Sequence, residues 1–189
     1  MMYINHKQTH KMSIAVTPLS ISEIEDIKLV FKLTRNLYNP IKIIYPSGDY
    51  YKGETNNNYE KHGFGELLYT DGSVLALKWK NDSCNGKCVF MSYNNDIIYK
   101  GEYKNGLFHG QGKLTYSDNV YNGSFVAGKK SGFGYIHYNN GSSYIGNWKY
   151  DNFHGDGVLH YLDNLYSGIW NKGCQDKTGV IMTGSIMLH

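Results

Sequence analysis

The chain has 189 residues, among them 22 glycines, 18 tyrosines and only 3 prolines. This composition excludes collagen-like and proline-rich chains and favours aromatic strands separated by turns, and no stretch reaches the roughly 18 consecutive apolar residues of a membrane-spanning helix. The net charge of +3 is not gathered into a basic stripe, which argues against a nucleic-acid partner because phosphate neutralisation supplies most of the affinity of such binders.

Residues 1–40 form an N-terminal segment whose composition differs from the rest, since no glycine precedes Gly48. Ser20 and Glu23 have the spacing of a helix capping box. Apolar residues follow on one side of the same stretch: Ile21, Ile24, and Ile27 or Phe31. We therefore predict a short helix. Two roles are open to it: capping the exposed first edge of a sheet, which the need to cover such edges favours, and binding a partner.

Residues 41–184 repeat one pattern with a period of about 23 residues, the kind of spacing that marks a repeat architecture. The skeleton is Tyr-x-Gly-x-aromatic, then Gly-x-Gly, then aliphatic-x-Tyr. A half copy opens the array near Ile41. Six further copies align on one position: Tyr51, Leu75, Tyr99, Tyr121, Tyr144 and Tyr166. We expect three parts: the segment 1–40, the array 41–184 and a tail 185–189.

The alternation within a copy predicts two short antiparallel strands. Tyr99, Gly101 and Tyr103 are spaced by two, as residues on one face of a strand are, and polar Lys100 and Glu102 lie between them. Glycine on the ring-bearing face leaves room for neighbouring rings to lie against the backbone. Turn sequences separate the strands: Asn105-Gly106 within a copy, and Asp71-Gly72 and Asn140-Gly141 between copies.

An isolated hairpin cannot bury its own apolar face, so neighbouring copies must stack to be stable. We predict an all-β fold, an elongated and twisted single antiparallel sheet about 58 Å long at 4.8 Å per strand. The pattern resembles the MORN (membrane occupation and recognition nexus) repeat over about Ile41 to Thr183. The second copy departs from it at Leu77 and Cys88, and the sixth at Lys177, each of which replaces a glycine.

The resemblance implies a scaffold for protein association or membrane apposition and no catalytic activity. The sequence also offers no assembled nucleophile, base and orienting carboxylate, so we expect no enzyme and no cofactor. The segment Gly123–Lys130 is one residue from a Walker A loop, but Lys130 stands where the magnesium-binding hydroxyl belongs and no helix follows.

Metal binding is likewise not expected. The three histidines that precede Gly-x-Gly belong to different copies and are read as loop residues: His62, His109 and His154. Equivalent positions in neighbouring copies lie about 10 Å apart, too far for a shared metal. Cys84 and Cys88 have no second pair, and Cys174 lies four copies later. The odd cysteine number and the absence of a secretory signal favour an intracellular, cytoplasmic setting.

The candidate binding surface is an aromatic groove, because a single sheet cannot cover all of its own rings and exposed aromatic surface is typical of partner sites. Its residues are Tyr103, Tyr116, Phe125, Tyr138, Trp148, Tyr161 and Trp170. A protein partner of unknown identity is the first expectation. The alternative is peripheral binding to anionic phospholipids through Lys129 and Lys130, although the array as a whole, these two lysines included, is neutral. The free sheet edges would also allow homodimers.

Overall fold

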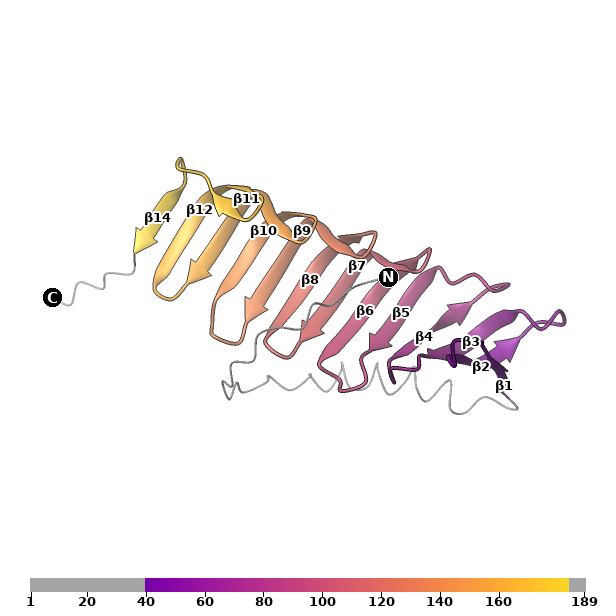
Figure 1. The fold of residues 1–189 in the computed structure, drawn as a ribbon. Coiled ribbons are helices and arrows are strands. Elements are labelled where there is room, and N and C mark those ends of the chain that lie inside the picture. The colour runs from indigo at the N-terminus through magenta and orange to yellow at the C-terminus, as the bar shows by residue number, and fades with distance from the viewer. Residues whose placement is uncertain (1–39, 184–189) are drawn as a thin grey trace.

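The computed structural model describes residues 40–183, which form one open antiparallel sheet of 14 strands (Figure 1). From β1 to β13 the strands follow one another in space as they do in sequence, and β14 pairs with β12. Their bounds are β1 (Ile41–Ile44), β2 (Tyr50–Thr55), β3 (Lys61–Leu68), β4 (Val74–Trp79), β5 (Gly86–Met91), β6 (Ile97–Lys104), β7 (Leu107–Tyr116), β8 (Asn119–Val126), β9 (Lys129–Tyr138), β10 (Ser143–Lys149), β11 (Asn152–Tyr161), β12 (Asn164–Asn171), β13 (Cys174–Gln175) and β14 (Val180–Thr183). The prediction of an elongated all-β sheet is confirmed; the predicted N-terminal helix lies outside the described residues.

Each copy of the repeat is a hairpin, here called a unit. The six units are β2–β3, β4–β5, β6–β7, β8–β9, β10–β11 and β12 with β13 and β14. The opening half copy is β1, which pairs with β2 through Ile43 and Tyr51. The predicted turns are present: Asn105 and Gly106 have φ of 51° and 81°, and Gly72 and Gly141 have φ of 83° and 85°.

A row of glycines crosses the sheet at right angles to the strands. In register they pair as Gly101 with Gly112, Gly112 with Gly123 and Gly123 with Gly134, and the row continues to Gly168. In each regular hairpin, the tyrosine two residues before the first of the two paired glycines lies over both of them. Tyr99, for example, lies over Gly101 and Gly112, and a Cβ built on Gly112 would meet the Tyr99 ring at 2.5 Å. The glycine row therefore exists because the rings rest directly on the backbone, which confirms the reason predicted for these glycines.

The first glycine of each Gly-x-Gly serves a different purpose. Register shifts mark a β-bulge in the hairpins of units 1, 3, 4 and 5, and the glycine within each bulge, on the second strand of the hairpin, has positive φ, from 59° at Gly110 to 98° at Gly132. Other residues reach that conformation only at a cost. The Gly-x-Gly motif, read from sequence as a turn, is thus a bulge glycine followed by a member of the glycine row inside a strand.

The two irregular units show what these positions require. In unit 2, Leu75 replaces the tyrosine, and Leu77 and Cys88 fill the space that the glycine pair leaves elsewhere. In unit 6, Lys177 stands in place of the bulge glycine, and the closing strand is split there into β13 and β14, both paired with β12. Each departure from the pattern therefore coincides with a local change of structure.

Candidate functional site

The face of the sheet that carries the repeat tyrosines is called the ring face. Tyr51, Tyr99, Tyr121 and Tyr144 are fully buried there although the sheet has one layer. Their hydroxyls donate to backbone carbonyls three residues on, from Tyr99 to Glu102 O at 2.7 Å and from Tyr144 to Asn147 O at 2.9 Å. Each buried hydroxyl thus has a backbone acceptor close to the bulge. The side chains of the ring face form the hydrophobic core.

The seven predicted groove residues divide into two rows, one on each side of the buried tyrosines. Tyr103, Phe125, Trp148 and Trp170 form one row and are buried in the core. Tyr116 and Tyr138 are half-buried and pack against the core from the other side, and Tyr161 is 51% exposed. The structure does not bring the seven together as one open groove, and their role in partner binding stays a prediction.

In units 3, 4 and 5 the second residue after the hairpin turn lies against the repeat tyrosine ring. Phe108 and Phe153 stack on Tyr99 and Tyr144, each with ring centroids 3.7 Å apart and planes 12° from parallel. In unit 4 the same position is Lys130, whose Nζ lies 5.4 Å from the Tyr121 ring centroid. Lysine and phenylalanine are therefore alternatives at this position, each in contact with the repeat tyrosine of its own unit.

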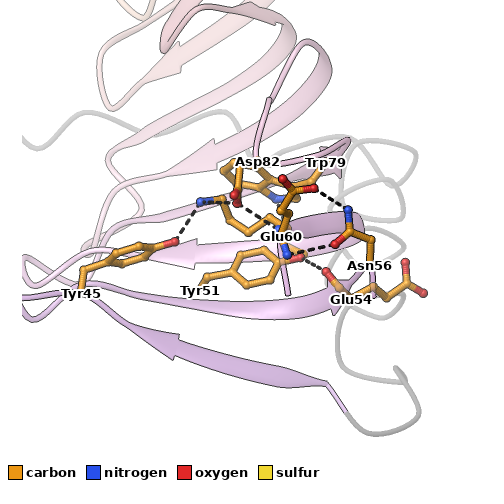
Figure 2. A network of polar contacts seen from close by, with 9 residues as sticks. Tyr45, Tyr51, Glu54, Asn56, Glu60, Trp79 and Asp82 are labelled. Carbon is orange, nitrogen blue, oxygen red and sulfur yellow. Dashed lines mark hydrogen bonds and ion pairs between the residues drawn. The ribbon is translucent and has the colours of Figure 1, made fainter. Parts of the chain in front are cut away.

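Unit 1 uses Lys61 at this position and adds polar contacts to it. Its Nζ donates to the Tyr45 hydroxyl at 2.9 Å, forms an ion pair with Asp82 at 3.1 Å and lies 5.0 Å from the Trp79 ring centroid. Figure 2 shows Tyr45, Trp79 and Asp82 converging there, beside Tyr51. Burial opposes ionisation, but the hydrogen bonds to Tyr45 and Asp82 leave the pKa of Lys61 above its usual value.

The predicted lipid-contact pair, Lys129 and Lys130, is split between two environments. Lys129 is exposed, whereas the ammonium of Lys130 lies 4.9 Å from the Trp148 ring centroid within the ring face. Burial lowers the pKa of Lys130, and the negative charge of Asp151 opposes this only in part. Of the two, Lys129 is the one placed to meet an external anion.

Replacing Lys130 with phenylalanine is expected to stabilise the protein by about 1 kcal/mol. The ring would stack on Tyr121 as Phe153 does on Tyr144, and aromatic pairs contribute about 0.5–1.5 kcal/mol beyond burial; the desolvated charge is removed as well, at the loss of its cation–π contact. Urea unfolding of K130F and the exposed control K129F measures this. A destabilised K130F with an unchanged K129F would contradict it.

The buried tyrosines also make the fold sensitive to alkali. Burial raises the pKa of Tyr69 and Tyr144 to about 12 and raises that of Tyr99 and Tyr121 as well, from an ordinary value of 10.0. A phenol whose pKa is higher in the folded state contributes stability that is complete below pH 10 and is lost as the pH rises towards the folded value.

We therefore expect the free energy of unfolding to fall between pH 10 and pH 12, by up to about 1.4 kcal/mol per pH unit for each tyrosine involved, and the urea midpoint to fall with it. The half-buried Lys130 works in the opposite direction, because the desolvation of its charge ceases to cost stability as the amine deprotonates. The variant Y144F should show a shallower pH dependence than the parent. A midpoint that stays constant over this range would refute the assignment.

The remaining catalytic and metal candidates do not converge on a site. His62, His109 and His154 lie within β3, β7 and β11 rather than in loops as predicted, because the bulge glycine that follows each belongs to the strand. Cys88 is buried, which raises the pKa of its thiol to about 12. Within residues 40–183 no three histidine, cysteine or acidic side chains are grouped to hold a metal ion. The Walker-like segment is the β8–β9 hairpin, turning at Ala127 and Gly128.

The other side of the sheet, here called the opposite face, has two distinct halves. Over β3–β8 it is hollowed into a groove of about 1080 Å³, called the opposite-face groove. Side chains from successive strands line it: Phe64, Ala76, Val89, Lys100, Glu102 and Asn122. This concavity was not predicted, since alternation assigns side chains to faces but does not give the curvature of the sheet.

Over β9–β14 the opposite face carries an exposed apolar patch. Its members are Phe133, Tyr135, Ile145, Ile169, Val180 and Met182. Tyr135 pairs with Ile145, which pairs in turn with the half-buried Val158, so the patch is continuous across β9, β10 and β11. Sequence reasoning missed it because unit 3 has lysines at the corresponding positions; apolar residues at the polar positions of units 4 and 5 are the signal that could have found it.

A single-layer sheet of tandem hairpins, with tyrosines over a glycine row, defines a class of β-repeat scaffold. The MORN repeat family matches five consecutive segments of the chain: residues 57–74, 78–97, 99–120, 121–143 and 144–165. These matches cover more than half of the 189 residues, and the chain belongs to the MORN repeat family. No helix that could cross a lipid bilayer occurs in the part of the chain that the structure describes.

Proposed function

We propose that this protein is a non-catalytic, intracellular MORN scaffold that binds a protein partner. The observation that carries the proposal is the exposed apolar patch, because a large apolar surface left open beside polar residues is typical of an interaction site. Membership of a repeat family known from protein-binding and membrane-associated scaffolds agrees with it. The cell compartment and a cytoskeletal or membrane location belong to the same proposal.

The chemistry around the patch favours an amphipathic segment with acidic flanks as the partner. Lys129 and Lys149 are exposed at the ends of β9 and β10, on the same face as Phe133 by alternation. Apolar side chains of the segment would cover Tyr135 and Ile145, while acidic ones would meet the two lysines. Rim charges of this kind contribute more to orientation and association rate than to affinity.

The test compares a patch variant with a matched variant at the far end of the sheet. Y135T/I145T removes apolar surface from the patch, and I44T/Y59T removes it from the same two residue types in β1 and the following hairpin, where they are more exposed, at 68% and 75% against 44% for Ile145 and 38% for Tyr135. After affinity capture from cells and reconstitution from purified components, the partner should bind the parent and I44T/Y59T but bind Y135T/I145T at least tenfold more weakly. Equal binding by all three would exclude the patch.

Peripheral binding to anionic phospholipid is the alternative function. The observation that favours it is the exposed Lys129, whose ammonium lies 6.0 Å from the ring centroid of exposed Tyr150. A lysine beside an aromatic ring is suited to a lipid interface, but one lysine supplies only about 1 kcal/mol. Flotation with phosphatidylserine vesicles at physiological salt decides: co-flotation lost in K129E would place lipid binding above protein binding.

A further inference from the structure

The opposite-face groove and the exposed apolar patch follow one another along the glycine row. Three glycines of that row line the groove: Gly101, Gly112 and Gly123. In register the row continues with Gly134 and Gly146, whose neighbours in sequence, Tyr135 and Ile145, belong to the patch. The groove and the patch are therefore consecutive parts of one surface that crosses the opposite face.

Two exposed lysines lie opposite each other in the lining of the groove. Lys78 is on β4 and Lys87 is on β5. Ala76 pairs with Val89, two residues before Lys78 and two residues after Lys87, so the two lysines share the opposite face and the same level of the sheet. Like charges directly opposite each other destabilise a strand pair. An anion bound between the two ammonium groups would remove that cost.

No carboxylate among residues 40–183 forms an ion pair with either of these lysines. The Nζ atom of Lys78 lies 5.7 Å from the ring centroid of Phe64. Glu102 pairs with Lys87 in register, but its carboxylate is turned towards β7, where Oε1 accepts a hydrogen bond from the backbone N–H of Gln111 at 3.0 Å. The positive charge of the two lysines is therefore available to an external anion.

The dimensions of this surface suit one short peptide segment. The groove lysines begin on β4 and the patch reaches Ile169 on β12. The eight inter-strand spacings between these strands span about 38 Å, and an extended chain of about 12 residues has the same length. Such a segment would lie across the strands, with one half over the groove and the other half over the patch.

We propose that the opposite face binds one extended segment of a partner protein, about 12 residues long, with an acidic half and an apolar half. The acidic half lies in the opposite-face groove against Lys78 and Lys87, and the apolar half covers Tyr135 and Ile145. This inference rests on the proposed function, because both use the patch, and it adds the position and chemistry of the acidic half. Each half alone binds weakly, but binding of one half raises the effective concentration of the other.

Fluorescence anisotropy with labelled synthetic peptides tests the proposal at physiological salt. Two bipartite probes join six glutamates to the sequence Leu-Ser-Leu-Tyr-Ser-Leu, with the glutamates first in one and last in the other. Control probes replace either half with glycine and serine, or the glutamates with lysines. One bipartite probe should bind at least tenfold more tightly than either half alone, and the lysine probe should bind no better than the apolar half.

Charge variants locate the acidic half. K78E/K87E and the milder K78Q/K87Q should both lower the affinity for the bipartite probe towards that of the apolar half. K80E/K104E is the matched control, because Lys80 and Lys104 are also exposed but do not line the groove, and it should leave the affinity unchanged. Circular dichroism of each variant verifies that the sheet is folded.

The patch variant Y135T/I145T separates this inference from the proposed function. If it weakens binding of the bipartite probe while K78E/K87E does not, the groove contact is refuted and the patch remains. If only K78E/K87E weakens binding, the patch is refuted, and the proposed function with it. Equal binding of the bipartite and half probes would overturn the inference. So would flotation with phosphatidylserine vesicles that is lost in K78E/K87E, because the lysines would then serve a lipid.

Discussion

Replacing Trp148 with alanine is expected to destabilise the protein by about 3–5 kcal/mol, the range for removal of a large buried aromatic side chain. The Trp148 ring lies edge-on between Tyr121 and Tyr144, with centroids 5.1 and 5.4 Å away, and its Nε1 donates to Gly134 O at 3.2 Å. It therefore joins units 4 and 5. A single-layer sheet has no second layer that could close the cavity.

Chemical denaturation of W148A, followed by circular dichroism, measures the loss. Y150A is the matched control, because Tyr150 is an aromatic residue two positions on that is 62% exposed, and surface substitutions usually change stability by less than about 0.5 kcal/mol. A loss below 1 kcal/mol in W148A would mean that the rings are not the core. Weak partner binding by W148A would report unfolding, which is why the binding test uses the exposed apolar patch.

The second large effect is expected from a single methyl group. A Cβ on Gly134 would lie 2.3 Å from the Tyr121 hydroxyl oxygen and 2.5 Å from its ring carbon Cε2, so G134A must displace a fully buried ring. Overpacking of this kind costs about 1–3 kcal/mol. Unit 2 indicates that a smaller side chain in place of the tyrosine would relieve this overpacking. There, Leu75 replaces the tyrosine and lies beside Leu77 and Cys88, which replace the glycine pair.

A double-mutant cycle tests whether the Tyr121 ring and Gly134 are energetically coupled. Y121L and G134A should each destabilise the protein, and the double variant should be more stable than their added losses predict, with a coupling of about 0.5–3 kcal/mol. G141A is the control: φ is +85° at Gly141, but nothing lies within 4 Å of its Cβ position. It should lose stability through strain and show no coupling to Y121L. Additive losses for G134A would disprove the pairing.

Much of the fold could be predicted because six copies of the repeat carry the same pattern of aromatic residues, glycines and turns, with departures in the second and sixth. Alternation placed Tyr99 and Gly101 on one face, and the positions of the turns gave the hairpins. The bulges could not be predicted, since a glycine such as Gly110 looks the same in sequence whether it supplies positive φ or space. Lys130 could not be assigned to a ring from its charge, and only Phe108 and Phe153 in equivalent positions reveal its place.

The candidate site was less predictable than the fold, because exposure depends on neighbours from other units. Trp148 and Tyr161 both belong to the repeat pattern, yet one is buried and the other is largely open. Burial of Trp148 requires rings on both sides of it, which the sequence of one unit does not contain. The curvature that hollows the opposite face is likewise a property of several strands together.

Within residues 40–183, each hairpin from unit 1 to unit 6 pairs with its neighbours along the chain, and this has a consequence for how the protein unfolds. Apart from the pairing of β14 with β12, the main contacts between strands join strands that follow one another in the chain. The array therefore resembles a one-dimensional Ising chain more than a globule, with stability set by the free energy of each unit and by its coupling to its neighbours. Thermal unfolding should start at the ends of the array or at unit 2, where no tyrosine links the two strands, and should then spread from one unit to the next. Calorimetry would then record an enthalpy larger than the van't Hoff value.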